Sequence, residues 1–299
     1  MSQPLRTTLA RRKAEALLKQ KGIDTLPVDP FSIAEASDIV VEPKAGTAGG
    51  VSGMLLRHGD VFGILYATHI SSEGFQRFSV AHELGHYFLD GHIDHVLPKG
   101  ASIHTSHAGY VSGDQYELEA DNFATGLLMP EALFRNALRT QRRSPGLSAV
   151  EALAGRCRTS LTATAIRYAD LSDDPVTVIV STGSTIDYCR LSESMKSLRE
   201  LSWLKKGSPV PMKTATARLN AKPDRVARAD RETEEIDILD WLGGVCSVNA
   251  TEEVVGLGSY GKTLTILSCP SLQDQADDED EGEDEASLIE SWTPRFRRR

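Results

Sequence analysis

The stretch His82-Glu83-Leu84-Gly85-His86 decides how the first half of this 299-residue chain is interpreted. Two histidines four residues apart lie on one face of a helix, about one turn apart, so their imidazoles can bind the same metal ion. Glu83 projects about 100° further around the helix, where its carboxylate can reach a water molecule without being a metal ligand. The pentapeptide therefore predicts a metal site together with its catalytic base.

The residues before and after the pentapeptide support a helix that is buried on one side. Apolar or small residues recur at a spacing of three to four: Phe75, Phe78, Ala81, Gly85, Phe88 and Leu89. All eight histidines of the chain lie between His58 and His107. This concentration around one segment favours a metal site over scattered surface histidines.

A catalytic zinc ion needs three protein ligands and one open position, so a third ligand must be found. Residues 115–129 predict a second helix, on which Glu117 could complete the set and Asp121, one turn later, could accept the remaining N–H of a ligating histidine. His92 lies at the third-ligand offset of a longer zinc motif, although Leu89 replaces the glycine of that motif. The residues alone favour Glu117 and leave His92 and Glu119 as alternatives.

The remaining N-terminal half alternates helices with short strands. Helices are predicted at residues 6–21, 31–37 and 131–140, strands at 39–43, 51–56 and 61–67, and a loop at 91–113. Strands 51–56 and 61–67, joined by a turn at 57–60, form a small antiparallel sheet, in which 61–66 is a candidate edge strand for an extended substrate. Residues 148–169 predict two short helices of helix-turn-helix length, opened by a capping box at Ser148.

The second half predicts an α+β domain with an antiparallel sheet, built from strands at 176–180, 252–257 and 263–267 and a helix at 194–205. The predicted domains are residues 1–143 (metal site), 144–170 (helix pair), 171–272 (C-terminal domain) and 273–299 (tail). The tail holds nine acidic residues between Asp274 and Glu285 and accounts for most of the net charge of −9, so it is predicted to be disordered.

Composition also excludes several classes of protein. No apolar run has the length of a membrane span and no secretory signal precedes the first helix, so we expect a cytoplasmic protein without membrane contact. The four cysteines form no C-x-x-C pair. Residues 256–263 match the phosphate-loop pattern, but the alternating residues that follow predict a strand in place of the required helix, so no nucleotide is expected.

Direct DNA binding is not favoured, because the body of the chain is close to neutral without its tail. The residues that could contact phosphates are five arginines around the helix pair: Arg142, Arg143, Arg156, Arg158 and Arg167. The alternative to a peptidase is therefore a DNA-binding regulator with a structural or vestigial metal site.

Three segments, in this order, make the comparison with known proteins specific. Residues 77–86 (RFSVAHELGH), followed by 117–124 (ELEADNFA) and 127–130 (LLMP), resemble the ImmA/IrrE family of metallopeptidases. The resemblance covers roughly residues 10–169. It implies a zincin-like fold, metal ligands His82, His86 and Glu117, and Glu83 as the catalytic base. It also implies cleavage or inactivation of an Xre-type helix-turn-helix repressor, which switches on stress-response or mobile-element genes.

The resemblance implies a gluzincin-like mechanism with zinc as the default metal, although two histidines and a glutamate could also hold manganese. The metal would activate water and polarise the scissile carbonyl, while Glu83 takes a proton and passes it to the leaving amine. Tyr110, His104 and His107 lie in the predicted loop that could supply a second electrophile. Beyond residue 170 the match is weak. A GAF-like sensor domain there would resemble the IrrE branch.

Overall fold

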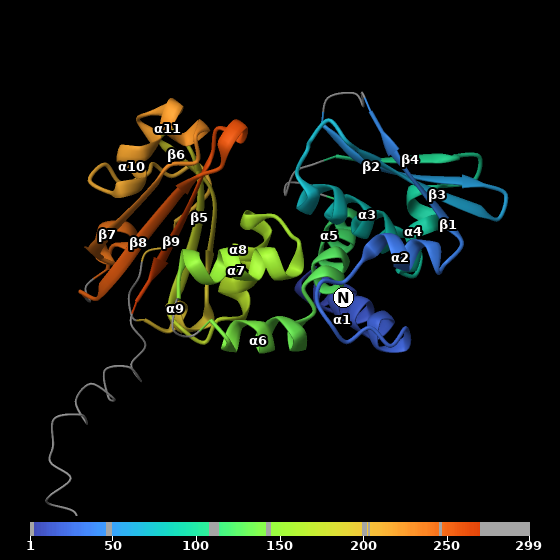
Figure 1. Cartoon of the computed structure of the whole chain (residues 1–299), viewed down its shortest axis with the longest axis horizontal. Coiled ribbons are helices and arrows are strands. Elements are labelled where there is room, and N and C mark those ends of the chain that lie inside the picture. Colours follow the sequence, from blue (N-terminus) through green and yellow to red (C-terminus); the bar gives the residue numbers. More distant parts are fainter. Residues whose placement is uncertain are drawn as a thin grey trace, which may run out of the picture. The chain divides into compact units, whose positions relative to one another are not determined.

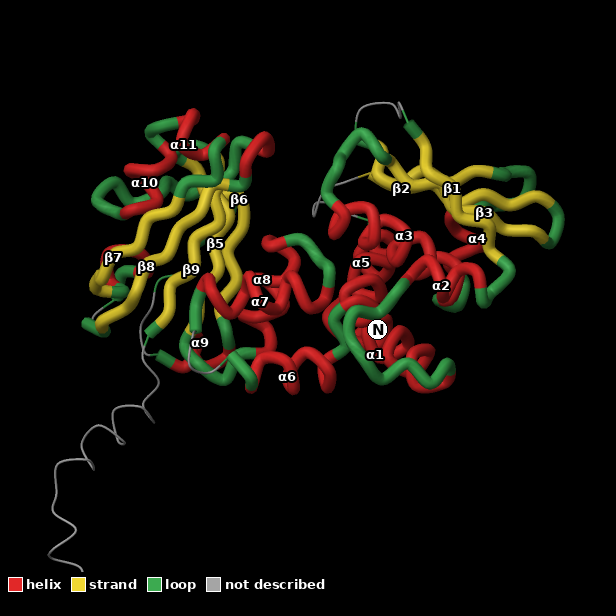
Figure 2. Tube along the Cα trace, in the orientation of Figure 1, coloured by secondary structure: helices red, strands yellow, loops and turns green. Residues whose placement is uncertain are grey.

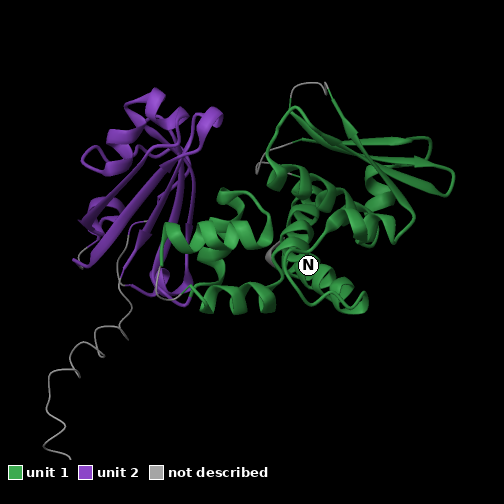
Figure 3. Ribbon diagram, in the orientation of Figure 1, with its two compact units in different colours: residues 1–172 green, residues 173–299 purple. Residues whose placement is uncertain are grey.

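The structure is a computed structural model, which describes residues 3–45, 50–107, 114–141, 145–198, 202, 204–244 and 247–269. The chain divides into two compact units, Met1–Ser172 and Asp173–Arg299 (Figure 3). The acidic tail and the arginines 142 and 143 lie outside the described residues. Each unit has its own sheet and helices, so each is described separately.

The N-terminal unit contains a four-stranded sheet in the order β1-β3-β2-β4. Its strands are β1 (Ile39–Lys44), β2 (Val51–His58), β3 (Val61–Ala67) and β4 (Ile103–His107). The hairpin β2–β3 confirms the predicted pair of strands, but β1 runs parallel to β3, so the sheet is mixed and not antiparallel. The helix α2 (Pro30–Glu35) precedes β1. The parallel pair arises because β3 lies between β1 and β2, antiparallel to β2 on one side and parallel to β1 on the other.

The predicted edge strand at residues 61–66 is wrong, because β3 lies inside the sheet between β1 and β2. The open edge beside the histidines is β4, which pairs antiparallel with β2 only. β4 and the short helix α4 (His92–Val96) both lie in the predicted loop 91–113. The sequence of β4, Ile-His-Thr-Ser-His, has a single apolar residue, so pairing with β2 and not alternation makes it a strand.

Two helices carry the motif residues. The helix α3 (Glu73–Phe88) begins at Ser72, whose hydroxyl accepts a hydrogen bond from the backbone N–H of Phe75. The helix α5 (Gln115–Leu128) begins at Asp114, whose carboxylate accepts from the N–H of Tyr116. Both helices confirm the predicted segments. In Figure 1, α3 lies between the sheet and α5, and it packs against β2 and β3.

The other helices of this unit surround α5. The N-terminal helix α1 (Gln3–Gln20) packs along α5, and a Cβ at Gly126 of α5 would lie 2.8 Å from the carbonyl oxygen of Arg11, so this crossing requires glycine. Three more helices follow α5: α6 (Glu131–Arg139), α7 (Leu147–Cys157) and α8 (Leu161–Leu171). The pair α7–α8 confirms the two short helices predicted at residues 148–169. The capping box predicted at Ser148 is wrong, because α7 begins after Gly146 and Ser148 lies inside the helix.

The C-terminal unit is an antiparallel sheet in the order β6-β5-β9-β8-β7, which confirms the predicted α+β class. Its strands are β5 (Val176–Thr182), β6 (Thr185–Leu191), β7 (Arg231–Asp237), β8 (Asn249–Gly256) and β9 (Thr263–Ser268). Four short helices accompany the sheet: α9 (Glu193–Ser197), α10 (Ala215–Asn220), α11 (Pro223–Ala227) and α12 (Leu239–Leu242). Figure 2 shows β9 in the middle of the strands, in yellow.

Two sequence predictions in this unit have different outcomes. The helix predicted at residues 194–205 is shorter, because α9 ends at Ser197 and the described residues 202 and 204 are not helical. The glycine-rich match at residues 256–263 forms the turn between β8 and β9, and the strand β9 follows it where a phosphate loop needs a helix. Lys262 of that turn forms an ion pair with Asp187 at 2.7 Å.

None of the helices in the described ranges is long and apolar enough to span a membrane.

Candidate metal centre

Three side chains from two helices meet at one point in the N-terminal unit. His82 and His86 come from α3 and Glu117 comes from α5, and their ligand atoms all lie within 4.8 Å of one another. The Nε2 atoms of the two histidines are 3.1 Å apart, and the carboxylate oxygens of Glu117 lie 3.2 Å from His82 Nε2 and 3.4 Å from His86 Nε2. We call His82, His86 and Glu117 the donor cluster.

The close crossing of the two helices brings Glu117 to the histidines. A Cβ at Gly85 would lie 3.0 Å from the Cα of Ala120, so a larger residue at this position of the motif would force α5 away. Glu117 is one turn before Ala120 on the same helix, and it therefore reaches the metal-binding face of α3.

The charges in the donor cluster favour a cation. Burial opposes the charging of His82, but hydrogen bonds with Asp121 and Glu117 outweigh it and raise the pKa of His82 to about 10. Burial opposes the ionisation of Glu117 too, yet its contacts with His104, His82 and His86 hold the pKa of this carboxyl well below its usual range. At His86 burial is the largest effect and lowers the pKa to about 3, which leaves a neutral imidazole with a free lone pair. A neutral imidazole beside an ionised carboxylate suits a divalent metal ion.

Asp121 lies where the sequence predicted it, behind a histidine of the donor cluster. Its Oδ1 is 2.9 Å from Nδ1 of His82, on the side of the ring away from Glu117. A carboxylate in this place accepts the Nδ1–H and leaves Nε2 of His82 facing Glu117, which is the arrangement that orients a ligating histidine.

Glu83 is fully buried beside the donor cluster. Neither of its carboxylate oxygens makes a hydrogen bond of normal geometry with a described residue. Burial is the largest effect and raises the pKa of Glu83, while the charge of His82 and the Ser106 hydroxyl act in the opposite direction. A buried carboxylate without a fixed partner is costly for the fold, so its placement indicates a role in chemistry.

Gly53 of β2 makes the space that this carboxylate occupies. A Cβ built on Gly53 would lie 2.5 Å from Oε1 of Glu83, which is closer than two such atoms can approach. A glycine inside a strand signals such a close approach, so this position could have been singled out from the sequence.

We expect Gly53→Ala to fold but to displace the Glu83 carboxylate. Overpacking of this kind costs about 1–3 kcal/mol of stability, and a displaced catalytic group costs about 100-fold in rate. Gly63→Ala on β3 is the matched control, because its Cβ would meet no atom closer than 3.6 Å. Thermal unfolding and peptidase assays of both variants measure the effect; equal activity in the two would contradict the role of Gly53.

His104 reaches the centre from the edge strand β4. Its Nε2 lies 3.1 Å from Glu117 Oε1, and its ring packs against that of His86 with centroids 4.8 Å apart. His104 also forms a second group of ligand atoms within 4.8 Å with Glu83 and His86. Of the three candidate electrophiles, His104 is the one that the described residues bring to the centre, whereas His107 is exposed and Tyr110 lies outside them.

The two alternative third ligands, His92 and Glu119, lie behind the donor cluster. His92 contacts His86 on the far side of its ring, with 3.2 Å between the two Nδ1 atoms. Glu119 contacts His92 and Arg6. Among the described residues, neither His92 nor Glu119 belongs to a group whose ligand atoms are close enough to hold one metal ion. Glu117, which the residues favoured, is the carboxylate that faces both histidines of the motif.

The pair of histidines, the facing glutamate and the buried carboxylate beside them are the groups that a metallopeptidase site requires. The comparisons agree with this class. Residues 34–168 match the family model described as the IrrE N-terminal-like domain, Peptidase_M78. This match supports the assignment of residues 34–168 to the ImmA/IrrE family.

A solved structure shares the fold. It is a "Mycobacterium tuberculosis transcriptional regulator" and is 16% identical in sequence, with a TM-score of 0.56 over 87% of this chain and 76% of that chain. At this identity the likeness concerns the fold alone. None of the curated proteins compared matches the chain.

Proposed function

We propose that this protein is a metal-dependent endopeptidase that cleaves or inactivates an Xre-type helix-turn-helix repressor in the cytoplasm and so de-represses stress-response or mobile-element genes. The observation that carries the proposal is the donor cluster with the buried Glu83 carboxylate beside it, whose oxygens make no hydrogen bond of normal geometry with a described residue. The match of residues 34–168 to the model of a peptidase family supports it. Zinc is the metal expected at two histidines and a glutamate, with manganese as the alternative.

The proposed ligands are His82, His86 and Glu117, with Asp121 holding the ring of His82 through its Nδ1 atom. A bound divalent ion would supply Lewis-acid polarisation of water and of a peptide carbonyl. Glu83 would hold a proton at its carboxylate and release it to the leaving amine, and its raised pKa brings this exchange closer to neutral pH. His104, whose Nε2 lies 3.1 Å from Glu117, would donate a hydrogen bond to the developing oxyanion.

The edge strand β4 is the proposed docking element for an extended peptide. It pairs with β2 along one side only, and it carries His104. A substrate strand added to this edge would gain main-chain hydrogen bonds next to the proposed electrophile. The C-terminal unit is proposed to sense a signal or to recognise the target, and a GAF-like domain stays a prediction.

The test is incubation of the purified protein with the Xre-type repressor encoded by a neighbouring gene, in the presence of zinc or manganese. We expect defined fragments in mass spectrometry, their loss on addition of a chelator, and their return when metal is restored. Fragments that persist unchanged in chelator, or a repressor that stays intact under every condition, would count against the proposal.

The alternative function is a DNA-binding regulator, which is favoured by the fold shared with a transcriptional regulator. It requires salt-dependent binding of duplex DNA by this protein alone. One of the arginines proposed for phosphate contacts is not available, because Arg167 is buried and donates to the carbonyl oxygen of Met129 at 3.1 Å. Arg158, another of these arginines, already forms an ion pair with Glu73.

A further inference from the structure

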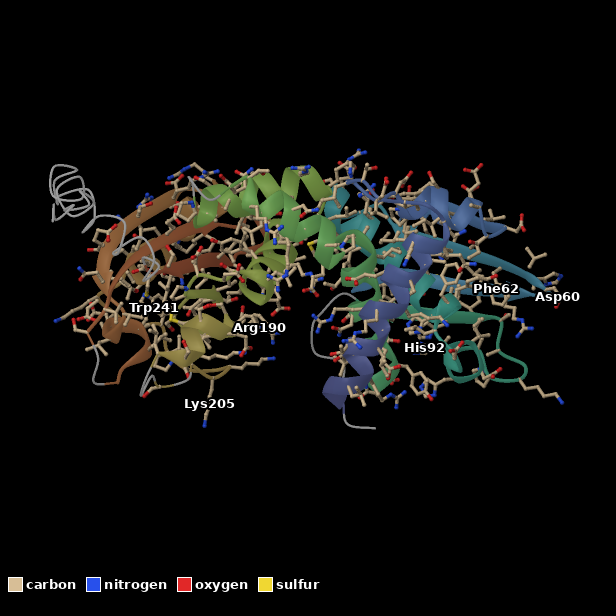
Figure 4. The ribbon with its side chains drawn as sticks, turned by 90° about the horizontal axis from the view of Figure 1, so that it is seen from below. Asp60, Phe62, His92, Arg190, Lys205 and Trp241 are labelled. Atoms are coloured by element: carbon tan, nitrogen blue, oxygen red, sulfur yellow. The ribbon has the colours of Figure 1, made fainter. Side chains whose placement is uncertain are left out.

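A chain of polar contacts, buried at His92 and Glu119, runs from His86 to the partly exposed Arg6 of the N-terminal helix. His92 has no exposed surface, and its Nδ1 lies 3.2 Å from Nδ1 of His86. On the other side of the His92 ring, Nε2 lies 3.2 Å from Oε2 of Glu119. The second oxygen of Glu119 is 2.6 Å from Nε of Arg6 and 3.0 Å from Nε2 of Gln115. We call Arg6, Glu119 and His92 the His92 relay. Figure 4 labels His92 within the N-terminal unit.

We propose that the His92 relay holds His86 in the tautomer that carries its proton on Nδ1, so that the lone pair of Nε2 faces the donor cluster. The three residues are positioning residues, because none of them reaches the donor cluster except through His86. The proposal rests on the function proposed above, in which His86 is a metal ligand. It extends that function to residues that the metal-binding motif does not contain.

Hydrogen-bond chemistry fixes the direction of each contact. Arg6 and Gln115 both donate to Glu119, and an arginine partner pairs with a carboxylate, which can only accept hydrogen bonds. His92 must therefore donate to Glu119 from Nε2. A neutral imidazole that donates from Nε2 has only a lone pair at Nδ1, so the hydrogen bond between the two histidines requires the proton on Nδ1 of His86.

The Nδ1–H tautomer of His86 provides the lone pair that metal binding requires. With its proton on Nδ1, His86 has a lone pair on Nε2, the atom that lies 3.1 Å from His82 Nε2 and 3.4 Å from Glu117. Asp121 acts on His82 in the corresponding way through a direct carboxylate contact at 2.9 Å. The two histidines of the motif are thus oriented by different devices, a single aspartate for His82 and a three-residue relay for His86.

Aromatic packing holds the relay in place. The ring of Tyr116 meets His92 edge-on, with centroids 4.9 Å apart, and the guanidinium of Arg6 lies 5.5 Å from the centroid of the same ring. His95 stacks on Tyr116 at 3.7 Å and contacts Asp114 instead of the relay. His95 therefore offers a neighbouring histidine for a control variant.

The relay also includes a helix outside the family match. Arg6 lies on α1, whereas the family model covers residues 34–168. The geometry of His86 therefore depends on the packing of α1 against α5. The motif residues of the site lie on α3 and α5. The helix α1 contributes to the site as a third helix, through Arg6.

The sharpest test is Glu119→Gln, which keeps the shape of the side chain and removes its charge. Arg6 and Gln115 both donate to this position, so the amide oxygen of the variant turns toward them and its NH₂ group faces His92 Nε2. His92 must then accept at Nε2 and donate from Nδ1, which moves the proton of His86 to Nε2. Long-range ¹H–¹⁵N correlation spectra of the metal-free protein distinguish the two tautomers of His86. We expect Nδ1–H in the wild type and Nε2–H in the variant.

A second measurement is zinc affinity by competition with a chromophoric chelator. We expect a loss of about 10- to 100-fold in Glu119→Gln, the range for partners behind a metal ligand. Arg6→Gln should cost less, because Glu119 can still accept from His92. His95→Gln should leave both the tautomer and the affinity unchanged.

An Nε2–H tautomer of His86 in the wild-type protein overturns the relay, and this measurement needs no variant to fold. An unchanged tautomer in Glu119→Gln overturns it as well. The tautomer is measured without metal, so its outcome is separate from that of the proposed function, which fails if the wild type binds no metal or cleaves no repressor.

Discussion

Glu83→Gln is expected to leave the fold and the metal content intact while reducing cleavage of the repressor by about 10²- to 10⁴-fold, the contribution of general acid–base catalysis. Glutamine has nearly the same shape as glutamate, so the space above Gly53 stays filled, but its amide cannot take up and release a proton. Fragment formation followed by mass spectrometry measures the effect, with metal content determined in parallel.

The same variant makes a separate prediction about stability. The buried Glu83 carboxyl has a raised pKa, and it contacts no described hydrogen-bond donor with normal geometry. A carboxyl whose pKa is higher in the folded state destabilises the fold once the unfolded chain ionises, above about pH 4.3. The metal-free variant should therefore melt no lower than the metal-free wild type at pH 7. Full relief of repression by Glu83→Gln would exclude a peptidase mechanism.

Glu117→Ala is expected to lose its bound metal altogether. The carboxylate of Glu117 lies within 3.4 Å of the Nε2 atoms of His82, His86 and His104, so its removal leaves the donor cluster with two histidines and no carboxylate. Removal of a ligand should weaken metal binding by more than roughly 10- to 100-fold, which is the loss expected when a residue that hydrogen-bonds to a ligand is replaced. Elemental analysis of the purified variant measures this directly.

His92→Ala is the matched comparison for Glu117→Ala, because His92 was the alternative third ligand. We expect this variant to keep metal at saturating zinc, with weakened affinity, because its contact is to the far side of His86. Retention of metal in Glu117→Ala together with its loss in His92→Ala would reverse the ligand assignment.

Much of the N-terminal unit could be predicted from local signals. The apolar spacing around Phe75 and Phe78 predicted α3, and the hairpin β2–β3 followed from alternation with a turn at Gly59. Glu117 was accessible to prediction because a metal site of this type needs a third ligand and α5 offers it at its first turn.

Other parts of the site depend on contacts that no local pattern encodes. β4 is polar, and His104 reaches the centre only because β4 pairs with β2. The His92 relay joins residues 6, 92 and 119, which α1, α4 and α5 bring together. Gly53 is an intermediate case, since a glycine within a strand gives a signal but does not say which side chain needs the space.

The position of β9 has a consequence for the order in which the protein is made. β9 is the central strand of the C-terminal sheet, so this sheet cannot close until the ribosome has passed residue 268. The donor cluster, Glu83 and the His92 relay all precede residue 122. At typical rates of synthesis the interval is on the order of ten seconds. A nascent chain, or one truncated by a premature stop codon between these points, would have every residue of the candidate metal centre and no completed C-terminal unit.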